Sequence, residues 1–393
     1  MNQPNETNQI GQTAQDPVLF DTLPTNDGHY LGVITLNAPK ALNAVDLTMC
    51  QQIFQQLQIW EQQPQVVAIF LQGTGEKAFC AGGNIRKIYD SIIQRPAMSE
   101  PQSIHLPSNL DYAEAFFVNE YRLNRYMASY PKPIIAWASG IVMGGGLGLV
   151  ATCSHRIVTE TTRFAMPEVN IGLFPDATGS WFLQKMPAQI GLFFGLTGAN
   201  GNASDALLCN VAEFSLKSEQ KSTILKTLQT ANWQQGDAKA VVSHTLSQLH
   251  TTEHLPSSNV LKHWQTLQKI VNAGDMLAID NLLKDKEFMA KFCQDKWLVE
   301  AIHTYQNGCP VTARLTHALF YRVKTLSLSE ILQIELNTAI HCCHFPDFRE
   351  GVRALLVDKD KNPTWHKSLS VIADDYINAH FSNVWQGDDV LVL

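Results

Sequence analysis

The chain has 393 residues, 45% of them apolar, and a net charge of -7 at pH 7. This length is sufficient for a complete hydrophobic core with a second, smaller module. The negative charge excludes a general attraction to nucleic acid or to an anionic membrane surface. Any phosphorylated ligand therefore has to be bound by a local group of basic side chains.

The first sixteen residues, 1–16, are rich in Asn, Gln and Thr and predict a disordered tail. They contain acidic residues and no Arg, which differs from a signal or transit peptide and predicts a cytoplasmic, bacterial setting. The eight cysteines form no C-x-x-C pair, so a reducing compartment is favoured over a disulfide framework.

Short apolar runs alternate with helical patterns in the first half of the chain. The runs at 33–36 and 66–71 predict strands, and apolar residues at helical spacing between 47 and 60 predict a helix that connects them. The same rhythm continues with a strand at 134–137, a helix at 145–152 and a strand at 156–158. We therefore predict an α/β layer structure whose chemistry lies in the loops that follow strands.

Two segments are rich in glycine, 79–84 (FCAGGN) and 140–148 (GIVMGGGLG). Glycine has no side chain, so backbone N–H groups beside a helix start are left accessible to a developing negative oxygen. Gly83 and Gly145 are therefore candidate donors of a two-amide oxyanion hole. The alternative is that these glycines only permit tight turns and close helix packing.

The run 134–153 contains no charged residue and is long enough to cross a bilayer. Its five glycines make membrane insertion weak, however. We predict a buried strand followed by a glycine-started helix instead, and no membrane span.

Glu168 and Asp176 stand eight positions apart, and Pro167 and Pro175 disfavour a continuous helix across them. Both carboxylates are therefore predicted to lie on a loop. A carboxylate among apolar neighbours is tuned toward neutral pH and suits a general base. Two alternatives stay open: Glu168 as a solvated charge, and Asp176 as the N-cap of a following helix. By pattern alone, Glu120 would be an exposed, ion-paired helix residue.

From about residue 215 the pattern becomes helical, with apolar stripes that need a partner surface. We predict an α/β core over 17–215 and a mainly helical region over 216–393. The segment 341–344 (HCCH) lacks the two-residue spacing of metal-ligand pairs, so an amphipathic helix with inward thiols is favoured and no metal is predicted.

Several segments together resemble the crotonase (enoyl-CoA hydratase/isomerase) superfamily. They are 34–44 (ITLNAPKALNA), 77–83 (KAFCAGG), 143–146 (MGGG) and 164–176 (FAMPEVNIGLFPD). The segment 347–365 (DFREGVRALLVDKDKNPTW) is similar to the 3-hydroxyisobutyryl-CoA hydrolase branch, which implies a place in valine catabolism. The resemblance covers about residues 17 to 370.

This resemblance implies a crotonase-like spiral of ββα units with a helical C-terminal region, and an acyl-CoA ligand. It assigns seven residues to the acyl site: oxyanion donors Gly83 and Gly145, catalytic Glu168 and Asp176, and substrate-binding Glu120, Gly144 and Gly82. In family hydratases a second catalytic glutamate follows the glycine triplet, and here that position is Gly148. Two departures from the hydrolase branch are Asn84, which replaces an Asp, and 178–180 (TGS), which replaces a more glycine-rich run.

The resulting prediction is hydrolysis of a short 3-hydroxyacyl-CoA thioester to a free hydroxy acid and CoA. CoA is part of the substrate, and no metal or redox cofactor is predicted. One alternative is an enoyl-CoA hydratase or isomerase, and another is a non-catalytic acyl-CoA-binding or assembly protein. No nucleic-acid or membrane partner is predicted, and a homo-oligomer is compatible with the sequence.

Overall fold

The computed structural model describes residues 13, 15–100, 104, 106, 109–234 and 236–385. The tail predicted at 1–16 lies almost entirely outside these residues.

The larger of two sheets consists of β1 (Val18–Pro24), β2 (Tyr30–Leu36), β3 (Val66–Gly73), β5 (Ile134–Ala138), β7 (His155–Val158) and β10 (Phe214–Ser215), in the order β1-β2-β3-β5-β7-β10. β1 and β2 form an antiparallel hairpin, and the other neighbours run parallel. The four predicted strands are confirmed. A parallel pair needs a crossover, and α1 (Leu47–Glu61) provides it between β2 and β3, which confirms the predicted helix.

A smaller sheet consists of β4 (Ala78–Cys80), β6 (Ile141–Met143), β8 (Arg163–Ala165) and β9 (Gly201–Asn202). These strands have two or three residues each, too few for a strand pattern to be recognised in the sequence. β3, β4 and α2 (Ile85–Ile92) form one strand-strand-helix unit, and β5, β6 and α4 (Gly145–Thr152) form the next. Each unit contributes one strand to each sheet, which confirms the ββα spiral.

The helix α3 (Tyr112–Ala128) packs on α1, α2 and α4. Three further helices precede β10: α5 (Gly179–Phe182), α6 (Ile190–Thr197) and α7 (Ala203–Leu208). Described residues after β10 form no strand. The first two α-helices after β10 are α8 (Lys221–Thr230) and α9 (Ala238–Leu249). Their residues Leu228, Val242 and Leu246 form one apolar cluster with Phe70 and Trp137 of the larger sheet.

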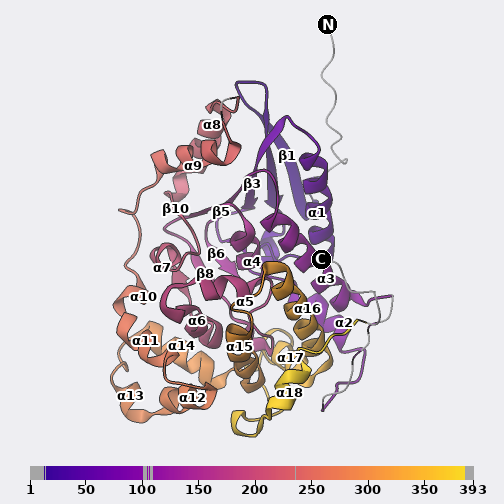
Figure 1. Cartoon of the computed structure of the whole chain (residues 1–393), viewed down its shortest axis with the longest axis vertical. Helices are drawn as coiled ribbons and strands as arrows, with labels where there is room; N and C mark the ends of the chain where they lie inside the picture. The colour runs from indigo at the N-terminus through magenta and orange to yellow at the C-terminus, as the bar shows by residue number, and fades with distance from the viewer. Residues whose placement is uncertain are drawn as a thin grey trace.

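The other helices after β10 are α10 (Asn259–Lys262), α11 (Trp264–Val271), α12 (Met276–Lys284), α13 (Lys286–Ala290), α14 (Lys296–Asn307), α15 (Pro310–Arg322), α16 (Leu328–His344), α17 (Pro346–Val352) and α18 (Asp374–Ala379). Figure 1 shows them gathered at the end of the molecule opposite α8 and α9. One apolar core includes residues from both sides of position 215, because α15 packs on α6 and α16 packs on α3. The division into 17–215 and 216–393 stays a prediction.

Cys342 and Cys343 are buried free thiols on α16, as the amphipathic-helix interpretation requires. Among the described residues, no group of three or more His, Cys, Asp or Glu side chains is arranged to hold a metal ion. No helix in the same part of the chain combines the length and apolarity needed to cross a membrane. Residues 134–153 form β5, β6 and α4, so the predicted strand followed by a glycine-started helix is confirmed.

Candidate active site

The first glycine turn, at Gly82 and Gly83, directly follows the short strand β4 rather than a strand of the larger sheet. Gly82 has φ +105°, a conformation that L side chains rarely adopt, and its N–H contacts the thiol of Cys80 at 3.4 Å. Burial raises the pKa of the Cys80 thiol to about 12, so this cysteine is not a thiolate nucleophile. Asn84 then caps α2 by accepting from the backbone N–H of Lys87, a role that Asp fills equally well.

The second glycine turn begins α4 and lies against the first. Gly144, at φ +52°, is the N-cap of the helix, and Gly145 is its first residue. A Cβ built on Gly145 would lie 3.6 Å from the Gly83 nitrogen, and one built on Gly144 would lie 3.7 Å from the Gly82 Cα. Two turns more than sixty residues apart in the sequence therefore meet in space.

The backbone N–H groups of Gly83 and Gly145 donate to no acceptor among the described residues. Gly145 is the first residue of α4, where an N–H has no partner within the helix. In contrast, the N–H of Gly144 donates to the carbonyl of Ala165 at 3.1 Å. The two backbone amides that the sequence analysis predicted as oxyanion donors are thus free to bind an external acceptor.

Gly146 and Gly148 bring α4 close to neighbouring backbone. A Cβ at Gly146 would lie 2.3 Å from the carbonyl oxygen of Cys80, and one at Gly148 would lie 2.2 Å from that of Ala177. Backbone atoms cannot move aside as the end of a side chain can. In this chain, the position of the second hydratase glutamate is therefore too crowded for a side chain.

All seven residues that the sequence assigned to the acyl site line one cavity of about 70 Å³. The side chains of Glu168, Asp176 and Glu120 are only 5%, 5% and 4% exposed. Glu168 is therefore not a solvated charge, and Glu120 is not the exposed helix residue that its local pattern indicates. A larger cavity of about 510 Å³, at the other end of α4, has no carboxylate among its described lining residues.

Glu168 begins a short 3-10 helix (Glu168–Ile171) just after Pro167, rather than lying on an irregular loop as predicted. Its Oε2 is buried and lacks a partner within the described part of the chain. Burial, and next the charge of Asp176, raise the pKa of Glu168 well above its ordinary value. A weakly acidic carboxyl group thus lies beside the second glycine turn, where a Cβ on Gly144 would be 2.8 Å from Glu168 Oε1.

Asp176 lies in the turn before α5. Its Oδ2 accepts a hydrogen bond of 2.7 Å from the hydroxyl of Tyr121. It is not the N-cap of α5, since that position belongs to Thr178. Burial raises the pKa of Asp176 to about 6, although the Tyr121 hydrogen bond opposes the shift. Burial and the nearby Asp176 also raise the pKa of Glu120 well above its ordinary value.

Sequence reasoning missed two buried residues beside this cluster. Tyr121 follows Glu120 on α3, and burial raises the pKa of its hydroxyl, so it remains a donor to Asp176. Glu335 on α16 is fully buried and accepts from the backbone N–H groups of Thr178 and Ser180 at 2.8 Å each. The sequence feature that could have indicated Glu335 is its position between Ile334 and Leu336, as an acidic residue with apolar neighbours in a helical pattern.

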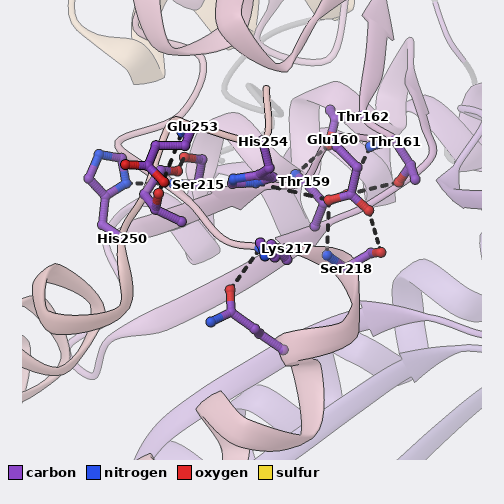
Figure 2. A network of polar contacts seen from close by, with 12 residues as sticks. Thr159, Glu160, Thr161, Thr162, Ser215, Lys217, Ser218, His250, Glu253 and His254 are labelled. Carbon is purple, nitrogen blue, oxygen red and sulfur yellow. Dashed lines mark hydrogen bonds and ion pairs between the residues drawn. The ribbon is translucent and has the colours of Figure 1, made fainter. Parts of the chain in front are cut away.

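A second grouping of serine, histidine and glutamate lies near the turn between β7 and β8 (Figure 2), and none of its residues lines the acyl cavity. Ser218 donates to Glu160 through both its backbone N–H and its hydroxyl, while His254 Nε2 lies 4.0 Å from Glu160 Oε2. Neither ring nitrogen of His254 has a hydrogen-bond partner among the described residues. A hydrolytic triad needs the serine bonded to the histidine, so this network is a structural tie rather than a catalytic site.

A sequence profile of the enoyl-CoA hydratase/isomerase family matches residues 31–381. The chain belongs to this family, the crotonase superfamily.

Among curated relatives, the mitochondrial 3-hydroxyisobutyryl-CoA hydrolase of Xenopus tropicalis is 33% identical over 362 residues, which is 91% of this chain and 88% of that protein. The enzyme of the same name from Homo sapiens is 32% identical over 360 residues, 91% of this chain and 87% of that protein. These relatives are named as mitochondrial, and the cytoplasmic location of this chain stays a prediction.

Two solved structures have the same fold along nearly their whole length. A carnitinyl-CoA dehydratase from Mycobacterium thermoresistibile superimposes with a TM-score of 0.78 and 27% identity, covering 94% of this chain and 97% of that one. An enoyl-CoA hydratase from Rhodobacter sphaeroides 2.4.1 gives a TM-score of 0.77 and 26% identity, with 94% and 98% covered. The predicted fold class is therefore confirmed.

Proposed function

We propose that this chain hydrolyses a short 3-hydroxyacyl-CoA thioester, of the 3-hydroxyisobutyryl-CoA type, to the free hydroxy acid and CoA. One observation carries the proposal: two backbone N–H groups and one oxygen of a buried carboxylate, all without a partner among the described residues, converge on one cavity. The likeness to 3-hydroxyisobutyryl-CoA hydrolases over 91% of the chain supports the same reaction.

In the proposed reaction, the thioester carbonyl oxygen accepts from the N–H groups of Gly83 and Gly145. Attack on the carbonyl carbon moves negative charge onto that oxygen, and donors already in place stabilise it without reorganisation. The glycines at 82 and 144 leave room for the acyl group between the turns, because a Cβ at either would enter this space.

Glu168 can supply the nucleophile in two ways. As a general base it removes a proton from water, and the resulting hydroxide displaces the CoA thiolate, which takes up a proton. As a nucleophile it displaces the thiolate itself to form a mixed anhydride, which water then opens to two carboxylates. Both routes require the ionised form of Glu168, and neither requires a metal or a redox cofactor.

Asp176 and Glu120 complete the proposed site. Asp176 orients the acyl group or the water, and its charge keeps the proton affinity of Glu168 high, since neighbouring carboxylates separate their pKa values. Glu120 binds the hydroxyl group of the substrate, for which a buried carboxyl group is a suitable partner.

Hydration or dehydration of an acyl-CoA is the second candidate, because the two similar solved structures carry a dehydratase and a hydratase name. The family's two-glutamate route is not available here, since Gly148 occupies the position of the second glutamate and has no space for a side chain. Hydrolysis is therefore favoured.

A panel of acyl-CoA thioesters with detection of free thiol tests the function directly. We expect thiol release from 3-hydroxyisobutyryl-CoA and little from acetyl-CoA or crotonyl-CoA. In ¹⁸O-water the label should enter the product carboxylate. Label at C3 of a product from crotonyl-CoA, without thiol release, would support the hydratase, and absence of any turnover would support a non-catalytic binding protein.

The raised carboxyl pKa values predict how activity depends on pH. A raised pKa means that Glu168 keeps its proton to a higher pH, and the protonated group can act neither as base nor as nucleophile. We therefore expect kcat/KM to fall on acidification with a midpoint well above the ordinary glutamate value of 4.5. A rate profile that stays level down to pH 5 would contradict this assignment.

A further inference from the structure

Glu335 is fully buried on α16 and is not one of the residues that line the acyl cavity. Its Oε2 accepts from the N–H of Thr178 and its Oε1 from the N–H of Ser180, both at 2.8 Å. No cation forms an ion pair with it among the described residues. A buried charge or acid without an ion partner is costly to keep, so a specific use has to account for it.

The turn that Glu335 binds is strained. Ala177 and Thr178 have φ values of +49° and +76°, in the left-handed region that non-glycine residues rarely adopt. Such residues are strained and persist only where the surrounding structure holds them. The N–H of Ser180 also belongs to the first turn of α5, and within the described part of the chain the side chain of the N-cap Thr178 makes no capping bond.

The structure assigns to Glu335 the role of a positioning residue: its carboxylate holds the strained turn 177–180 and thereby fixes Asp176 against the acyl site. This inference rests on the hydrolase function proposed above and deepens it. Asp176 precedes Ala177 directly, and the N–H of Gly179 donates to the Asp176 carbonyl at 2.7 Å, so the backbone of Asp176 is part of the turn.

The position of Glu335 against the turn 177–180 also affects the proton affinity of the nearby carboxyl groups. Among the described residues, Asp176 from the turn and Glu120 and Tyr121 from α3 interact electrostatically with Glu335. Burial, opposed by the two backbone hydrogen bonds and aided by the charge of Asp176, raises the pKa of Glu335 to about 8. In its ionised form Glu335 adds negative charge behind the cluster and raises the proton affinity of its neighbours.

Glu335→Gln tests the assignment. Glutamine keeps the size but has a single acceptor oxygen, so one of the two backbone bonds is replaced by a contact between donors. We expect kcat to fall by up to about 100-fold, as for other small misplacements of reacting groups, with KM changed less than about threefold.

The control is Glu330→Gln, the same substitution at an exposed position of α16, where Glu330 accepts from the backbone N–H and the hydroxyl of Ser327. Amide hydrogen exchange of the peptide containing 177–180 tests the contact independently of catalysis. The amides of Thr178 and Ser180 should lose protection from exchange in E335Q and keep it in E330Q. If E335Q does not fold, T178G/E335Q is compared with T178G, since glycine adopts the left-handed conformation without strain.

Each outcome decides the proposal. A kcat for E335Q equal to that of E330Q would overturn it, as would a loss of activity with unchanged amide protection. Failure of T178G/E335Q to fold would also overturn it, because the carboxylate would then serve the fold at large. Absence of thioester hydrolysis by the wild-type chain would reject the proposed function and not the role of Glu335. The hydrogen-exchange experiment would then still test whether Glu335 holds the turn 177–180.

Discussion

Glu168→Gln is expected to lower kcat for thioester hydrolysis by about 100- to 10,000-fold, the usual contribution of a general base, with acyl-CoA binding retained. Glutamine has nearly the same shape but cannot take a proton or attack the carbonyl carbon. Thiol release gives the rate, and titration with a non-hydrolysable acyl-CoA analogue gives the affinity. Turnover near the wild-type rate would reject Glu168 as base or nucleophile.

The same substitution should stabilise the fold at neutral and alkaline pH. The pKa of Glu168 is raised in the folded chain, so the fold loses stability as pH rises through that pKa and the buried group ionises. Glutamine does not ionise, so the melting temperature of E168Q should exceed that of the wild type at pH 8 and match it more closely at pH 5. Glu300→Gln, the same substitution at an exposed position of α14 outside the cavity, is the matched control for both measurements.

Gly145→Pro is expected to lower kcat by about 100- to 1000-fold beyond any effect of Gly145→Ala, because only proline removes the N–H that would bind the oxyanion. Gly145 is the first residue of α4, and proline is well tolerated at the first position of a helix. The comparison with alanine is essential, since any Cβ at this position would lie 2.2 Å from Glu120 Oε1 and displace that side chain.

Circular dichroism and thermal melting establish that both variants fold. Equal rates for G145P and G145A would show that the Gly145 amide does not bind the oxyanion. Gly83 has more space for a methyl group, because a Cβ there would lie 3.0 Å from the ring of Phe116 and 3.8 Å from Ile85 Cδ1, both side-chain atoms. A comparable loss in Gly83→Pro relative to Gly83→Ala would support the second donor.

Local sequence was sufficient to predict the features that depend on local chemistry. Glycines after short apolar runs indicated the two turns at 82–83 and 144–145, and the prolines at 167 and 175 excluded a long helix across the two carboxylates. The helix predicted at 145–152 has the same bounds in the structure. The resemblance to a known family then connected these turns with the carboxylates as one site.

The local sequence pattern gave a wrong prediction, or none, where the surroundings of a residue are formed by segments distant in the sequence. Glu120 has the sequence context of an exposed helix residue, yet α3 turns it toward the site and leaves it 4% exposed. The strands of the smaller sheet are too short to have a pattern of their own and exist because they pair with one another.

What the sequence by itself determined is the α/β rhythm, the two flexible glycine turns and the kinds of acid groups available. Only the tertiary structure decided that two amides more than sixty positions apart converge and that three carboxyl groups are buried in one cavity. It also placed Glu335 against the turn of Thr178, 157 positions away. The physical reason is that glycine geometry and capping depend on neighbouring residues, whereas burial and proton affinity depend on what the rest of the chain brings against a group.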